Sequence, residues 1–168
     1  RCALALLWRA VSSKHLCKRG IFASLLLSAC GAHSAAGAPP QPIGIAVAEV
    51  HYAPAPPNLP KGVQLAVLEG DPKCAGMFTL RLRVPAGFSL VPHTHPVDER
   101  VTVLAGAVQV GFGTTVDVAK TRTYPAGSFY INPPGLAHFV LSPRGADLQI
   151  TAMGPWRADF LSPAPNAP

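Results

Sequence analysis

The sequence predicts a single all-β domain, and three observations carry this prediction. Between residues 61 and 160, short runs of β-branched and apolar residues alternate with glycine and proline. No stretch of useful length shows a helical period. The 168 residues suffice for one domain with its own core and are too few for two. Closely spaced strands with frequent turns are typical of a β-sandwich or a β-barrel.

Seven segments are expected to form strands, because each is rich in apolar residues and is bounded by turn residues. Within one of them Leu80 and Leu82 alternate with Arg81 and Arg83, which places the leucines on the inner face and the arginines on the outer face. Residues 43–50 could add a first strand. The seven segments are residues 64–68, 78–84, 100–104, 108–112, 129–131, 137–141 and 148–153.

Five phenylalanines are expected to fill the interior of the domain. Core packing is their ordinary role, and a pocket for an aromatic or acyl group is the more specific alternative. They are Phe78, Phe88, Phe112, Phe129 and Phe139.

The charges are unevenly distributed, and this excludes one class of function. The net charge is +6, but residues 1–38 hold five of the fourteen basic residues and none of the eight acidic ones. The remainder is nearly neutral, so we expect no nucleic-acid partner. No apolar stretch reaches the roughly 18 residues of a membrane-spanning helix, so we expect none.

The N-terminal residues 1–38 resemble an export signal. Lys18 and Arg19 precede a short apolar run and then small residues. The sequence around Cys30 resembles the lipobox of bacterial lipoproteins, so Cys30 is either lipidated or removed with the signal. The Lys18–Arg19 pair also resembles a twin-arginine signal in part. We expect an exported, periplasmic protein, either free or held by a lipid anchor.

Three further segments complete the predicted organisation. Residues 39–60 hold seven of the nineteen prolines and are expected to form an extended tether. Residues 61–160 are expected to form the β-barrel, and residues 161–168 a tail rich in proline and alanine.

Three histidines and one glutamate indicate a metal site. His93 and His95 lie two residues apart, so on a strand both point to one face. Glu99 is again in phase with them, although Pro96 is expected to bend the path. His138 lies on a separate expected strand. Imidazoles with one carboxylate suit Fe(II), Mn(II), Ni(II), Cu(II) or Zn(II), and suit Ca(II) poorly. An isolated His-x-His pair is weak evidence, so the surrounding residues decide the interpretation.

Glycine and proline frame these residues at fixed spacings. The pattern Gly87-x5-His93-x-His95-x3-Glu99-x6-Gly106 resembles the first cupin motif, and Gly127-x5-Pro133-x-Gly135-x2-His138 resembles the second. Position 142 is Ser, where the second motif usually ends in Asn. In detail the chain is similar to exported bacterial single-domain cupins. The resemblance implies a double-stranded β-helix, or jelly-roll barrel, with one divalent transition metal on His93, His95, Glu99 and His138.

The resemblance does not decide between functions, and two hypotheses from different classes stay open. The first is a small metal-dependent oxygenase, of the dioxygenase type, acting on a small organic substrate. The second is a non-catalytic exported module that binds a small ligand or the metal itself. No catalytic residue is identified. Tyr124, Tyr130 and Arg100 are the open candidates beside the metal, while Asp98 is expected to point away and His51 to lie in the tether.

A homodimer is also expected. Cupin barrels commonly pair through an edge strand, and the apolar residues 63–68 offer such an edge.

Overall fold

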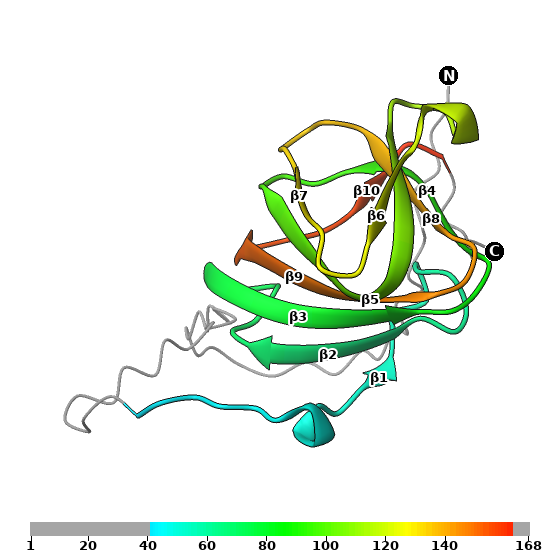
Figure 1. Cartoon of the computed structure of the whole chain (residues 1–168). Helices are drawn as coiled ribbons and strands as arrows, with labels where there is room; N and C mark the ends of the chain where they lie inside the picture. The colour runs from blue at the N-terminus through cyan, green and yellow to red at the C-terminus, as the bar shows by residue number, and fades with distance from the viewer. Residues whose placement is uncertain (1–40, 163–168) are drawn as a thin grey trace, which may run out of the picture. The chain divides into compact units, whose positions relative to one another are not determined.

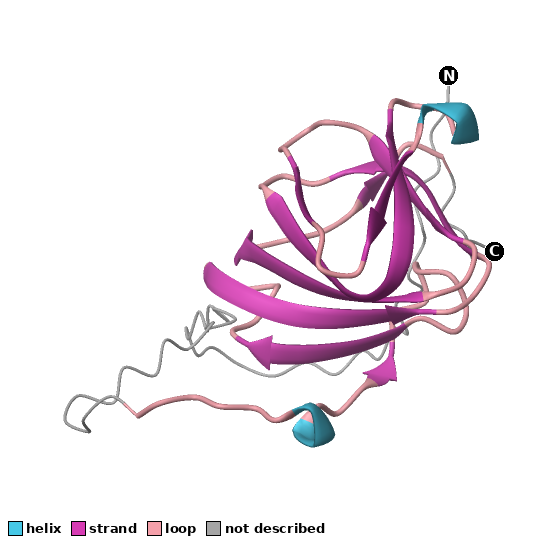
Figure 2. Cartoon of the chain, in the orientation of Figure 1, coloured by secondary structure: helices cyan, strands magenta, loops and turns pink. Residues whose placement is uncertain are grey.

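The computed structural model describes residues 41–162, which form an almost entirely β domain (Figures 1 and 2). The predicted all-β class is confirmed. Two short 3-10 turns, η1 (Val47–Glu49) and η2 (Val118–Lys120), interrupt the strands. The strands are β1 (Ala53–Pro54), β2 (Gln64–Glu69), β3 (Gly76–Val84), β4 (Phe88–Thr94), β5 (Glu99–Phe112), β6 (Arg122–Pro125), β7 (Phe129–Asn132), β8 (His138–Ser142), β9 (Ala146–Gly154) and β10 (Asp159–Phe160).

The strands form two antiparallel sheets that share β5. The first half of β5 pairs with β7 and β9, and its second half pairs with β6 and β8. One sheet therefore contains β1, β2, β3, β9, β5 and β7, and the other contains β10, β4, β8, β5 and β6. Figure 1 shows the two sheets curling around a common interior. This is the jelly-roll barrel that the sequence predicts.

Strand β5 differs from the prediction, which made residues 100–104 and 108–112 two separate strands. The structure has one continuous strand, and Gly106 lies inside it with a φ of 70°. A Cβ at this position would collide with the carbonyl oxygen of Gly145 on the neighbouring chain segment. Glycine therefore lets β5 bend from one sheet into the other.

Inward-facing side chains of both sheets fill the barrel. In β3, Leu80 and Val84 are buried and Arg83 is exposed, as the alternation predicts. Three of the five phenylalanines also lie in the interior, namely Phe78, Phe88 and Phe139. The prediction is wrong for Phe112 and Phe129, which are 45% and 56% exposed, because their strands turn these positions outward.

The residues before the barrel contribute more structure than an extended tether would. The strand expected at residues 43–50 does not form, because Val47–Glu49 turns into η1. Strand β1 pairs with β2, and Ala55 and Leu59 pack against the core. The predicted signal, including Cys30, lies outside the described residues, as does most of the predicted tail. Within residues 41–162 no helix is long and apolar enough to cross a membrane.

Candidate metal centre

His93 and His138 are brought together by strand pairing. They are directly opposed in the ladder between β4 and β8, and their ring centroids lie 4.3 Å apart. The register of this ladder shifts between Leu90 and His93. Leu90 and His93 both face inward although they are three positions apart, so the irregularity changes which residues of β4 face the barrel.

His95 and Glu99 reach the site by a route that simple alternation does not describe. Strand β4 ends at Thr94, the chain bends between residues 95 and 98, and Glu99 opens β5. The strand alternation is therefore interrupted between His95 and Glu99, at the bend that Pro96 predicts, and the three residues still meet. The turn before β8 supports the bend, because the Gly135 N–H donates to the carbonyl oxygen of His95 at 2.9 Å.

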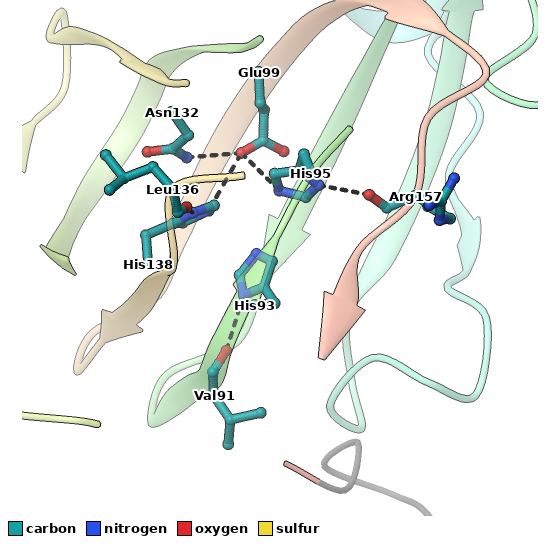
Figure 3. A network of polar contacts seen from close by, with 8 residues as sticks. All are labelled: Val91, His93, His95, Glu99, Asn132, Leu136, His138 and Arg157. Carbon is teal, nitrogen blue, oxygen red and sulfur yellow. Dashed lines mark hydrogen bonds and ion pairs between the residues drawn. The ribbon is translucent and has the colours of Figure 1, made fainter. Parts of the chain in front are cut away.

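Each of the three histidines has its Nδ1 atom beside a backbone carbonyl oxygen. His93 faces Val91 at 2.8 Å, His95 faces Arg157 at 2.7 Å and His138 faces Leu136 at 3.2 Å. A carbonyl oxygen only accepts, so in each neutral ring the proton sits on Nδ1 and the lone pair on Nε2. Figure 3 shows these contacts around the converging rings. Such outer partners are typical of metal-binding histidines.

The free nitrogens of the rings gather in one place. One ligand atom from each of His93, His95 and His138 lies within 4.8 Å of those of the other two. The Nε2 atoms of His95 and His138 are buried and have no hydrogen-bond partner. Buried polar atoms without partners are costly, and a metal ion would satisfy them. The three buried histidines could therefore hold a transition metal, as the sequence predicts.

Glu99 lies at the edge of this group. Its Oε2 is 3.3 Å from His95 Nε2 and 3.8 Å from His138 Nε2, and the carboxylate is almost fully buried. The same oxygen accepts a 2.8 Å hydrogen bond from the amide of Asn132, which faces Glu99 across the pair of β5 and β7. Asn132 is completely buried, and sequence reasoning missed it. Its position one residue before Pro133 is the one signal that could have drawn attention to it.

The electrostatics of the site follow from burial and from this carboxylate. Burial, with the neighbouring His138, lowers the pKa of His93 to about 4. Burial also lowers the pKa of His138. For His95 burial acts in the same direction, but the carboxylate of Glu99 outweighs it and raises the pKa. Burial alone would raise the pKa of Glu99, yet His95, His138 and the Asn132 amide lower it to about 2. Glu99 is therefore an anion at neutral pH.

The chain after β9 packs against two of the histidines. The indole ring of Trp156 stacks on His95 with centroids 5.0 Å apart and an angle of 17° between the planes. Strand β10 pairs with β4, so that Phe160 is opposed to His93 in the ladder. With the Arg157 carbonyl on Nδ1 of His95, this segment fixes the orientation of the ring. We call residues 155–160 the C-terminal strap.

The other candidate residues from the sequence fall into two groups, one next to the site and one outside it. Tyr130 is buried and lines a small cavity beside His93 and Glu99. Burial, the charge of Glu99 and the nearby Tyr124 raise the pKa of Tyr130 far above its usual value. Asp98 and Arg100 pair with each other at 3.0 Å on the surface, so neither serves the site. His51 is exposed in the segment before the barrel.

The fold and the buried histidines define a cupin, and comparison with known proteins agrees. The model of the ChrR cupin-like domain family matches residues 40–155. The chain belongs to this family.

Curated relatives in plants match a shorter stretch. Germin-like protein 1-1 of Oryza sativa subsp. japonica is 40% identical over 65 residues, which are 38% of this chain and 30% of the relative. Germin-like protein 5-1 of the same species is 49% identical over 49 residues, which are 29% of this chain and 22% of the relative. The chain thus spans less than a third of the length of these relatives.

Solved structures share the fold. The polyketide cyclase RemF from Streptomyces resistomycificus aligns with a TM-score of 0.58 at 20% identity, over 73% of this chain and 89% of that chain. A proposed acetylacetone dioxygenase from Methylibium petroleiphilum also gives 0.58, at 19% identity, over 79% and 88%. At these identities the likeness concerns the fold alone.

Proposed function

We propose that this protein is an exported metalloprotein that holds one divalent transition metal on His93, His95, His138 and Glu99 and acts as a small metal-dependent oxygenase. The observation that carries the proposal is the convergence of three buried histidines, with their ligand atoms within 4.8 Å of one another, next to a buried carboxylate. Among the described residues, none forms a hydrogen bond with the buried Nε2 atoms of His95 and His138.

The residues around the proposed metal ion have separate roles. The carbonyls of Val91, Leu136 and Arg157 hold the Nδ1 protons, so that the Nε2 atoms stay available. Asn132 holds Glu99 in one orientation, and Glu99 supplies the anionic charge. When bound, the metal would supply a Lewis-acid centre with coordination positions beyond the four protein ligands.

The oxygenase class is favoured because the site is poor in acids and bases. Apart from the four ligands, Tyr130 is the one ionisable side chain among the described residues that lines the adjoining cavity, and its raised pKa keeps it protonated. Hydrolysis or isomerisation would require a proton acceptor there. In oxygenase chemistry the metal carries more of the reaction.

Oxygen uptake tests the proposal. The metal-loaded protein should consume dioxygen with at least one member of a panel of small keto, hydroxy and carboxylic compounds. The uptake should disappear in His138→Ala and persist in His51→Ala, which changes an exposed histidine outside the site.

One observation favours the non-catalytic alternative. The three histidines are each at most 2% exposed, and the adjoining cavity is small, so an organic molecule has little room beside the site. A firmly held metal without oxygen uptake on any compound of the panel would establish a binding module instead.

Export and assembly belong to the same proposal. Lipid on Cys30 would place the barrel at a membrane surface, and separation of membrane and soluble fractions for wild type and Cys30→Ser tests this. The edge strand β2, of which β1 covers two residues, would support a homodimer, which light scattering at micromolar concentration tests.

A further inference from the structure

The three histidines of the proposed metal site are closed off from solvent. His93 and His95 are each 2% exposed, and His138 is completely buried. A metal ion that enters or leaves this site therefore has to pass an element that moves aside. Elements with few backbone bonds to the rest of a protein open most readily, so the most weakly held element beside the histidines is the candidate.

The C-terminal strap lies directly against two of the histidines. Trp156 stacks on His95, and the ring of Phe160 lies 5.7 Å from the ring of His93. The carbonyl oxygen of Arg157 is 2.7 Å from Nδ1 of His95. Figure 3 shows the strap passing along one side of the site, next to His95 and His93. The strap therefore covers the site from that side.

Few backbone bonds hold the strap on the barrel. Its strand β10 pairs with β4 over two residues, whereas β8 pairs with β4 and with β5 at four positions each. Beyond this short ladder, the N–H groups of Trp156 and of Leu161, directly after the strap, donate to the carbonyl oxygens of Pro72 and Pro92. Opening of the strap would break these bonds and leave the pairing of β4, β8 and β5 intact.

The closed position of the strap leaves one polar atom unsatisfied. The Nε1 atom of Trp156 is buried, and no group among the described residues accepts its hydrogen. A buried donor without an acceptor destabilises the conformation that buries it, because water would accept the hydrogen in an open conformation. The contacts of the indole ring with His95 and Phe78 act in the opposite direction. Ring packing and a few backbone bonds therefore hold the strap closed against this cost.

We propose that the C-terminal strap is a gate, which opens to let the metal ion pass and closes over the loaded site. The inference rests on the proposed function, because it concerns the passage of the proposed metal ion. Closure and binding support each other, since the Arg157 carbonyl keeps the proton of His95 on Nδ1 and leaves Nε2 for the metal. A His95 ring fixed by a metal ion in turn gives Trp156 a fixed surface on which to stack. Opening is therefore rarer in the loaded protein.

A cross-link between the strap and β4 tests the gate. Thr94 and Asp159 are opposed in the ladder of β4 and β10, at a separation that suits a disulfide. Oxidised Thr94→Cys/Asp159→Cys should take up Co(II), followed by its visible absorption, at least about 10-fold more slowly than Thr94→Ser/Asp159→Ser, which lacks the cross-link. When Co(II) is loaded before oxidation, its release to EDTA should slow by a similar factor.

The opposite edge of the same sheet provides the matched control. Gln109 and Thr123 are opposed in the ladder of β5 and the edge strand β6, so oxidised Gln109→Cys/Thr123→Cys carries a similar cross-link away from the strap. It should change neither rate. Unchanged rates with the strap cross-linked, faster release, or equal slowing by both cross-links would overturn the gate and leave the metal site intact. A wild-type protein that takes up no cobalt would instead overturn the proposed function, and the inference with it.

Amide hydrogen exchange of the wild-type protein gives an independent readout. Without metal, the N–H groups of Trp156 and Leu161 should exchange at least about 10-fold faster than those of β9, which is paired along both of its edges. Co(II) should slow the exchange of these two N–H groups at least about 10-fold and leave β9 unchanged. Exchange at Trp156 and Leu161 that is as slow as in β9, or that does not respond to Co(II), would overturn the gate.

Discussion

At the scale of single residues, the site depends on partners that are distant in sequence. Asn132 is 33 residues from Glu99, and the carbonyl of Arg157 is 62 residues from His95. The convergence of His93, His95, Glu99 and His138 could be predicted because the cupin motifs fix their spacing. Asn132 and Arg157 could not, since their contacts exist only after β5 pairs with β7 and the strap folds over β4.

Replacing Asn132 tests the support of Glu99. Asn132→Leu keeps the volume but removes the amide that donates to Oε2, so the carboxylate is held less firmly. Losses of outer partners typically cost 10- to 100-fold in metal affinity, and we expect a loss in this range by competition titration with a chelator. Asn58→Leu, in an exposed loop, is the control. An unchanged affinity in Asn132→Leu would show that Glu99 needs no such support.

The buried histidines also predict how the metal-free protein responds to acid. The pKa of His93 is about 4 in the folded state, against an ordinary value of 6.5, so the unfolded chain binds the proton more tightly. Stability is therefore lost as pH falls from about 6.5 through 4, by at most about 3 kcal/mol from this residue. The lowered pKa of His138 acts in the same direction, whereas the raised pKa of His95 opposes it.

Thermal unfolding of the metal-free protein at several pH values measures this effect. His93→Phe should lose less stability than the wild type between pH 6.5 and 4. His51→Phe, which changes an exposed histidine, should behave like the wild type. The interpretation fails should His93→Phe and the wild type show the same decline.

At the scale of elements, two local departures from regular strand geometry place the ligands. The irregularity before His93 turns that residue into the barrel, and Gly106 bends β5 so that it serves both sheets. Strand content could be predicted from apolar runs and turn residues. The continuity of β5 could not, because a glycine at positive φ within a strand resembles a turn residue in sequence.

The bend in β5 can be tested with two glycines of similar backbone conformation. A Cβ at Gly106 meets the Gly145 carbonyl, whereas at Gly87, with a φ of 76°, it meets nothing within 4 Å. Gly87→Ala should therefore cost about 1 kcal/mol from backbone strain alone, and Gly106→Ala about 2–4 kcal/mol in urea unfolding. If both variants lose the same free energy of unfolding, glycine is required at position 106 for its positive φ and not for the close approach of the Gly145 carbonyl.

The C-terminal strap gives the second element-scale prediction. Trp156 stacks on His95, so Trp156→Leu removes an aromatic surface that keeps the ring in place. We expect metal affinity to fall about 10-fold in a chelator competition, and Trp156→Phe to retain most of it. If Trp156→Leu and Trp156→Phe both bind the metal as tightly as the wild type, the Arg157 carbonyl alone holds the His95 ring in its orientation.

At the scale of the whole molecule, the core of the barrel is built from apolar side chains of both sheets, so we expect the barrel to fold without the metal ion. The family and the barrel could be recognised from the glycine and proline frame of the two motifs. The outward position of Phe112 and Phe129 could not, because apolar character alone does not show which face of a strand is buried.

Elemental analysis of protein purified without a metal-binding tag tests the central claim most directly. The account predicts about one equivalent of a divalent transition metal per chain. His93→Ala, His95→Ala and His138→Ala should each remain folded by circular dichroism and lose the metal, while His51→Ala should retain it. A wild-type protein without metal that also takes up none on addition of Fe(II), Mn(II), Co(II), Ni(II), Cu(II) or Zn(II) would contradict the account. Full occupancy in all three ligand variants would contradict it equally.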